Sequence, residues 1–152
     1  MLDAVIDVLE EAASWLWCRG IHQWEPGSMR LQRPTLLAWT KSGGLVVAMH
    51  GDELAGACFL VGEPGREWIH RPAVALYLHK LVVARLHSGS GVATSLLEWC
   101  KSQAQEMQIP RIRLDCWDGN AKLRAYYTSA GYAELEAVAS HDYEVRLFEL
   151  QI

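Results

Sequence analysis

The sequence has no excess of basic residues, no long apolar run and no basic segment near its start. These features would be expected of a nucleic-acid-binding, a membrane-spanning or a secreted protein, respectively. It has 14 lysine and arginine residues against 18 aspartate and glutamate residues, a net charge of -4, so a basic face for nucleic acid is not expected. No apolar run is long enough to span a bilayer. Residues 1–9 carry acids and no basic segment, which argues against a signal peptide. We therefore expect a cytoplasmic protein with no nucleic-acid partner and no membrane partner.

Metal sites and disulfides also have little support. The 4 cysteines include no C-x-x-C pair, and no two of the 6 histidines have the spacing of zinc ligands, so no metal is expected. Every cysteine lies in an apolar run, which predicts buried free thiols at Cys18, Cys58, Cys100 and Cys116.

The 152 residues, of which 51% are hydrophobic and 21% charged, predict a single domain over residues 1–152. Apolar spacing and the glycines and prolines between the apolar segments divide the chain into helices and strands. The expected helices cover residues 2–17, 34–40, 91–107 and 121–130, and the expected strands cover residues 45–50, 54–61, 74–83, 111–117, 132–138 and 143–150. The order ααββ(β)αβαββ indicates an α+β fold, with a mixed, mostly antiparallel central sheet flanked by helices.

The most informative segment is the glycine-rich turn at residues 88–93, where a predicted strand leads into a predicted helix. Free backbone N–H groups and the positive end of the helix favour an anion at such a junction. Gly89 and Gly91 would let the backbone approach a diphosphate closely. A dinucleotide-binding fold is disfavoured, because residues 89–94 lack the third glycine and about half of the chain precedes them.

The turn resembles the coenzyme loop of the GNAT superfamily of acyl-CoA-dependent N-acyltransferases, whose signature is (Arg/Gln)-x-x-Gly-x-(Gly/Ala). Gly91 and Ala93 match the signature, and Leu81-Val-Val83 resembles the strand end that precedes it. Ser88 departs from it, because the family usually has arginine or glutamine there. A second match lies one helix and one strand further on, where the family's offsets recur at Asn120, Leu123, Tyr127, Gly131 and Tyr132.

The resemblance, which covers roughly residues 76–132, implies both the cosubstrate and how it binds. In the family, two central strands splay apart and pantetheine pairs with backbone groups between them. Acetyl-CoA is the implied acyl donor, and the residues expected to bind it are Leu81, Val82, Val83, Ser88, Gly89, Ser90, Gly91, Val92, Ala93, Thr94 and Asn120. Asn120 is also expected to cap the helix that follows it.

Two residues are the catalytic candidates. Tyr127 matches the family position of the acid that protonates the departing thiolate; packing alone is the alternative. His79 occupies the strand position where many relatives carry a glutamate base, and a structural role is the alternative. A histidine of ordinary pKa, about 6.5, would suit the removal of a proton from an amine. The next candidates for the base are Glu25, Glu67 and Asp115.

Aromatic residues are frequent in the segments that the resemblance places on the acceptor side, where aromatic walls can hold a cation or a flat group. The residues expected to bind the substrate are Trp24, Trp68, Tyr77 and Trp117. Anchoring of the loops is the alternative for each tryptophan. Three other tryptophans fall in predicted helices and are interpreted as packing residues: Trp15, Trp17 and Trp99.

Together these features predict an N-acetyltransferase that moves an acetyl group from acetyl-CoA to a primary amine by direct attack. The expected acceptor is a small molecule such as an amino acid, a polyamine or an aminated natural product. Peptide or protein N-acetylation is the alternative within the enzymes, and a non-catalytic acyl-CoA-binding module is the alternative outside them. A homodimer is compatible with the resemblance.

Overall fold

The computed structural model describes residues 1–152, which form a six-stranded sheet with helices on both faces. The helices are α1 (Leu2–Trp17), α2 (Ser28–Leu31), α3 (Arg33–Lys41), α4 (Val92–Glu106) and α5 (Ala121–Ser129), with short 3-10 turns η1 (Arg66–Trp68) and η2 (Arg85–His87). The strands are β1 (Leu45–His50), β2 (Glu53–Val61), β3 (Leu76–Val83), β4 (Arg111–Trp117), β5 (Ala133–Ser140) and β6 (Tyr143–Gln151). Their order in the sheet is β1-β2-β3-β4-β6-β5, and only β3 and β4 pair in parallel. This confirms the predicted mixed, mostly antiparallel sheet.

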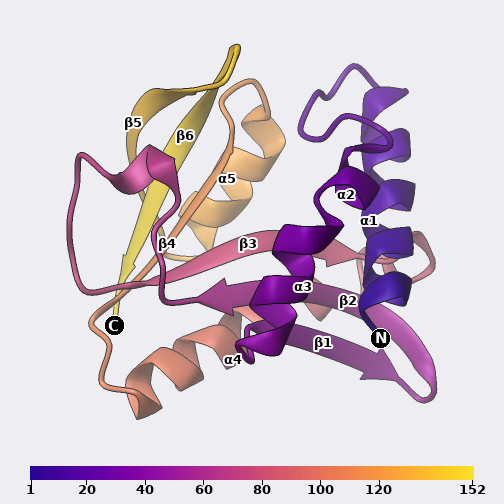
Figure 1. Ribbon diagram of the computed structural model, residues 1–152, viewed down its shortest axis with the longest axis horizontal. Helices are drawn as coiled ribbons and strands as arrows, with labels where there is room; N and C mark the ends of the chain where they lie inside the picture. Colours follow the sequence, from indigo (N-terminus) through magenta and orange to yellow (C-terminus); the bar gives the residue numbers. More distant parts are fainter.

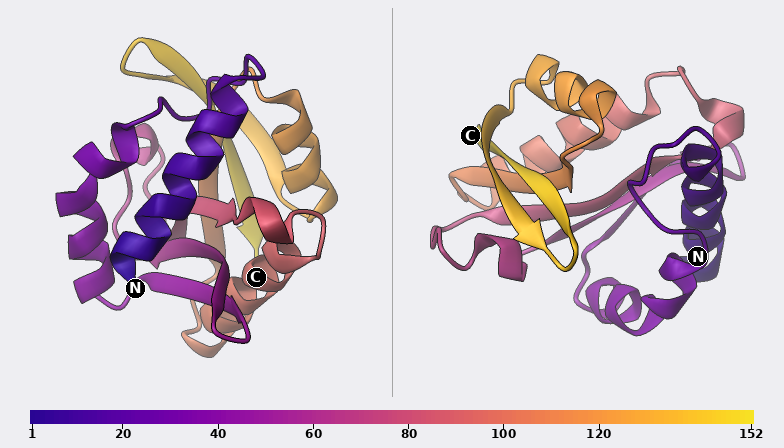
Figure 2. Two further views of the ribbon diagram at one scale, coloured as in Figure 1. Left: turned by 90° about the vertical axis from the view of Figure 1, so that its right-hand side faces the viewer. Right: turned by 90° about the horizontal axis from the view of Figure 1, so that it is seen from above.

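The helices divide between the two faces of the sheet. Helices α1, α2 and α3 lie on one face, and α4 and α5 lie on the other (Figures 1 and 2). Each set covers its own layer of buried apolar side chains. No helix has both the length and the hydropathy needed to cross a membrane.

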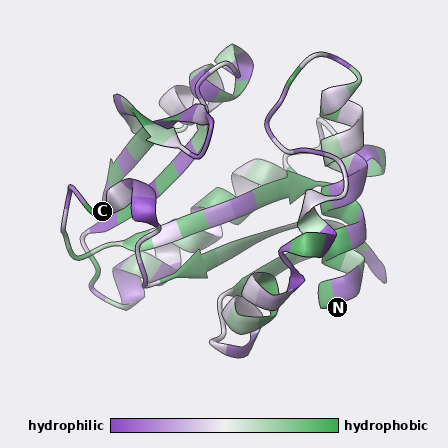
Figure 3. Ribbon diagram, turned by 45° about the horizontal axis from the view of Figure 1, so that its top comes forward, coloured by the Kyte–Doolittle hydropathy of each residue, from purple (hydrophilic) through white to green (hydrophobic).

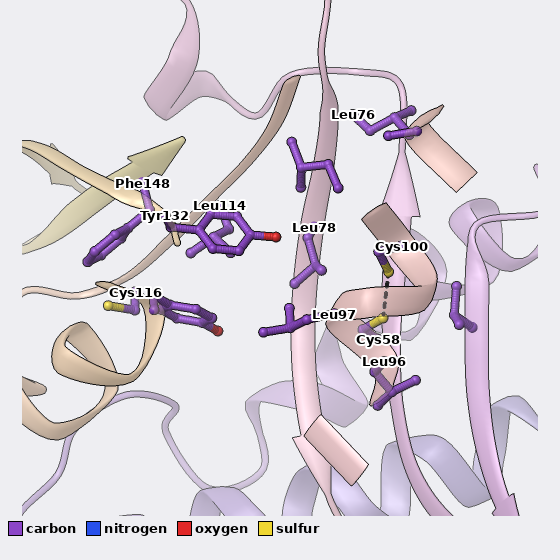
Figure 4. Packing of buried hydrophobic residues seen from close by; sticks show 14 residues of the cluster. Cys58, Leu76, Leu78, Leu96, Leu97, Cys100, Leu114, Cys116, Tyr132 and Phe148 are labelled. Atoms are coloured by element: carbon purple, nitrogen blue, oxygen red, sulfur yellow. Dashed lines mark hydrogen bonds between the residues drawn. The ribbon is translucent and has the colours of Figure 1, made fainter. Parts of the chain in front are cut away.

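The layer under α4 and α5 contains most of the thiols. The sulfur atoms of Cys58 and Cys100 lie 3.7 Å apart in this layer (Figure 4), and Cys116 is buried nearby. Cys18 is exposed, so the prediction of a buried thiol is wrong there. The reason is that Cys18 follows the last turn of α1, where the helix has ended and the chain turns into a loop.

Two of the three helical tryptophans that were interpreted as packing residues are also exposed. Trp17, in the last turn of α1, is 40% exposed, and Trp99, on α4, is 47% exposed. Trp99 faces away from the sheet, because the buried residues of α4 occupy other positions of the helical period. Trp17 continues the buried side of α1, but it lies in the last turn of the helix, beyond the last buried residue, Ala13.

A kink in β3 sets the directions of the side chains that follow it. Lys80 has a left-handed backbone with φ 55, and the register with β2 shifts at this point. Leu78 and Leu81 therefore both pack in the α4 layer, although strict alternation would place them on opposite faces. Strict alternation along the sequence predicts that His79 and Leu81 share a face, and this prediction is wrong, because His79 stacks on Trp39 of α3. Figure 3 shows this hydrophilic interruption in an otherwise hydrophobic strand.

Strands β3 and β4 diverge soon after they begin. They pair only between Leu76 and Ile112 and between Tyr77 and Arg113, whereas β4 pairs with β6 along its whole length. Figure 1 shows β4 rising away from β3 toward β5 and β6. Beyond Tyr77, the edge of β3 that faces β4 therefore has no partner strand.

Candidate active site

A cavity of about 840 Å³ lies where β3 and β4 diverge, which is in the size range of small-molecule sites. Its walls come from the second half of β3, the end of α1 with the loop after it, and the first turns of α5. Nine residues predicted for the site line this cavity: Trp24, His79, Leu81, Val82, Val83, Ser88, Ala93, Asn120 and Tyr127. Asp115, named as an alternative base, also lines it.

At one end of the cavity the chain leaves β3 and enters α4 through the predicted anion-binding turn. Gly89 and Gly91 have φ angles of 76 and 84, a conformation that glycine adopts without the usual steric cost. The backbone N–H groups of residue 89 and of residues 91–94 donate to no backbone carbonyl, and no side chain caps α4. These donors and the positive end of the helix form a cradle for an anionic group.

The last turn of α1 contributes a side of the cavity that the sequence analysis missed. Two guanidinium groups lie against the ring of Trp15, with Arg19 Cζ 3.8 Å and Arg85 Cζ 3.6 Å from the ring centre. All three side chains line the cavity. Trp15 and Arg19 are four residues apart where α1 ends, and this spacing was a signal that could have identified part of this cluster.

Tyr127 reaches the cavity from α5 through the layer under that helix. Only 4% of the residue is exposed, yet it is one of the lining residues. Burial raises the pKa of Tyr127 well above its ordinary value, and nearby Cys116 adds to the effect. The hydroxyl therefore stays protonated near neutral pH, as a proton donor must.

Asn120 caps α5 as predicted and also forms a hydrogen bond to the loop after α1 in the wall of the cavity. Its Oδ1 accepts a hydrogen bond from the Leu123 N–H at 3.2 Å, and its Nδ2 donates to Gln23 Oε1 at 3.3 Å. Gln23 Oε1 also accepts from the Trp117 N–H at 3.1 Å. The loop after α1 is thereby joined to both β4 and α5.

Three ionisable side chains line the floor of the cavity with perturbed pKa values. Burial lowers the pKa of His79, whose ring stacks on Trp39 at 4.5 Å, to about 4, and the Lys80 cation contributes. Burial lowers the pKa of Lys80 to about 8. Burial raises the pKa of Asp115 to about 7, with a contribution from Glu67. The expectation that His79 titrates near its ordinary value is therefore wrong.

Three of the four aromatic residues expected to bind the substrate lie outside the cavity. Trp68 is 1% exposed and Tyr77 2%, and both belong to a separate core cluster beside η1. Tyr77 precedes the divergence of β3 and β4, so it stays between paired strands. The Trp117 ring stacks on His22 at 5.7 Å and anchors the loop after α1. Trp24 alone of the four lines the cavity.

Comparisons with known proteins agree with this geometry. The sequence profile of the acetyltransferase (GNAT) family matches residues 9–132. The N-acetyltransferase YesJ of Bacillus subtilis (strain 168) is 28% identical over 156 residues, which cover 99% of this chain and 84% of YesJ.

Two solved structures are similar in fold. An acetyltransferase of the GNAT family from Desulfovibrio desulfuricans has a TM-score of 0.75 at 15% identity, with 99% of this chain and 91% of that chain covered. An aminoglycoside 6'-N-acetyltransferase complexed with coenzyme A has a TM-score of 0.69 at 14% identity, with 99% and 89% covered.

Proposed function

The chain belongs to the GNAT family of acetyltransferases, and we propose that it transfers an acetyl group from acetyl-CoA to the primary amine of a small molecule. One observation carries the proposal. A single cavity connects an anion-binding turn, an unpaired strand edge, a protonated tyrosine and a carboxyl group with a pKa of about 7. These are the groups that acyl transfer from a thioester to an amine requires.

The residues along the β3 side of the cavity fit acetyl-CoA. The free N–H groups of the turn suit its diphosphate. Arg85 and Lys122 line the same cavity and bring positive charge to a site where Ser88 replaces the family's arginine or glutamine. The backbone of Leu81–Val83 lies on the unpaired edge of β3, where it can pair with the amides of pantetheine as an added strand would.

Acetyl-CoA, when bound, supplies a thioester carbonyl that an amine can attack. A backbone N–H of the unpaired β3 edge would stabilise the charge that develops on the carbonyl oxygen. A base takes the proton that the amine nitrogen loses as the C–N bond forms. Tyr127 gives its hydroxyl proton to the sulfur as the C–S bond breaks. The products are the acetylated amine and coenzyme A.

For the base, we place Asp115 ahead of His79. A general base works best when its pKa lies near the working pH. The pKa of Asp115 is about 7, whereas that of His79 is about 4, so His79 holds a proton too weakly to remove one efficiently from an ammonium ion. His79 remains the second candidate, and its stacking on Trp39 gives it a role in forming the cavity wall.

A screen of acceptors tests the proposed function. The protein is incubated with acetyl-CoA and with amino acids, polyamines, aminoglycosides or a short peptide, and free thiol and acetylated product are measured. We expect thiol release with at least one small amine, at a higher kcat/KM than with the peptide. A preference for the peptide would assign the activity to peptide N-acetylation. Binding of acetyl-CoA without release in the presence of any amine would indicate a binding module.

A further inference from the structure

The charge of the cavity is opposite to that of the whole chain. The chain carries a net charge of -4, yet four cationic side chains line the cavity against one carboxyl group, Asp115. The four cations are Arg19, Lys80, Arg85 and Lys122. A surface of this kind repels acceptors that carry several positive charges, such as polyamines. It attracts a ligand that brings negative charge.

The cations differ in their surroundings. The guanidinium groups of Arg19 and Arg85 both lie against the Trp15 ring, and η2, which contains Arg85, leads directly into the anion-binding turn. Lys122 lies in the first turn of α5. Lys80 lies apart from this group on the floor of the cavity, on the kinked part of β3 between His79 and the proposed pantetheine edge.

Lys80 has no partner of opposite charge. It belongs to none of the ion pairs of the molecule, and no carboxylate oxygen lies within 4.0 Å of its ammonium group. Its Nζ points toward the Trp24 ring, 5.7 Å from the centroid, in the wall of the cavity. Desolvation of an ammonium group is costly unless an anion accompanies it. The pKa of about 8 leaves Lys80 mostly protonated at neutral pH.

We propose that the acceptor is an amino acid and that Lys80 binds its carboxylate beside Trp24. This inference rests on the proposed function. The amino and carboxylate groups of an α-amino acid share one carbon atom, and Lys80 and Asp115 are close enough for each to shift the other's pKa. The amine would face Asp115, the carboxylate would face Lys80, and Trp24 would contact the side chain.

Matched acceptors test the inference. Each α-amino acid is compared with its α-amide, which keeps the amine and the side chain and removes the negative charge. The parent is expected to prefer the best amino acid over its amide in kcat/KM. In Lys80→Gln this preference should fall by roughly 10- to 100-fold, mainly through KM, the range of a hydrogen bond to a charged group. Lys80→Arg should retain part of the preference, and Lys41→Gln, an exposed lysine of α3, should retain all of it.

Two results would overturn the inference. One is a preference for the amide in the parent protein, and the other is the same preference in the parent and in Lys80→Gln. Binding of the N-acetylated amino acid to the protein saturated with coenzyme A, measured by calorimetry, gives a readout that needs no turnover. Weaker binding in Lys80→Gln supports the role of Lys80 and equal binding rejects it, whereas absence of thiol release with every amine would reject the proposed function.

Discussion

Replacement of Asp115 by asparagine should make the protein more stable and nearly inactive. Asparagine keeps the size of the side chain and removes its ability to accept a proton. If Asp115 is the base, kcat should fall by about 10²- to 10⁴-fold, the usual contribution of a positioned acid or base. A rise in stability would show that the loss of activity does not come from unfolding.

The gain in stability follows from the pKa of Asp115. The environment that raises the carboxyl pKa of Asp115 from 3.8 to about 7 makes its ionisation in the folded state less favourable by up to about 4 kcal/mol. Asp115 lines an open cavity, where solvent screening reduces the measurable part to about 1–2 kcal/mol. Below pH 3.8 the folded and unfolded chains both hold the proton, so the penalty is absent. The penalty grows as the pH rises toward about 7 and is constant above that value.

Two pH series test the role of Asp115. The melting temperature of Asp115→Asn should exceed that of the parent by about 2–8 °C above neutral pH, and the difference should vanish near pH 4. The kcat/KM of the parent should rise with pH and level off above about 7, and Asp115→Asn should lose this rise. Equal melting temperatures at every pH, or an unchanged kcat/KM profile in the variant, would refute the assignment.

Three further substitutions test neighbouring parts of the site. Tyr127→Phe should lower kcat by about 10²-fold or more while acetyl-CoA binding is kept, and Tyr132→Phe, at a buried tyrosine that does not line the cavity, is the matched control; equal losses in the two variants would leave Tyr127 a packing residue. His79→Gln should lower kcat less than about tenfold and leave the pH profile near neutrality unchanged. If His79→Gln lost the rise of kcat/KM with pH, His79 and not Asp115 would be the base. Ser88→Arg should bind coenzyme A at least as tightly as the parent in calorimetry, and weaker binding would contradict the aligned register of the turn.

Local patterns made much of the fold predictable. Strand β4 was predicted with its observed bounds, because Ile112, Leu114 and Cys116 alternate with residues that face the other side. Helix α2 was not predicted, since four residues are too few to show a helical period. The kink at Lys80 left no signal either, because a left-handed backbone is usually marked by glycine or asparagine.

The two sides of the site differed in how far they could be predicted. The turn around Gly91 is a continuous segment in which glycines and the start of a helix together indicate an anion site. The acceptor side comes from separate segments, with Trp15 on α1, Trp24 in a loop and Asp115 on β4. Only the divergence of β3 and β4 brings these residues together, and the pKa of His79 depends on burial against α3.

In the proposed function, acetyl-CoA binds in this cavity with its diphosphate at the N-terminus of α4. Calorimetric titration of acetyl-CoA into the parent, Gly91→Gln and Gly91→Glu tests it most directly. Both substitutions strain the same left-handed backbone and enter the same open space, so they differ only in charge. We expect that the parent binds, that Gly91→Gln binds more weakly and that Gly91→Glu shows no measurable binding. Equal affinity in all three proteins would mean that the diphosphate does not bind at this turn.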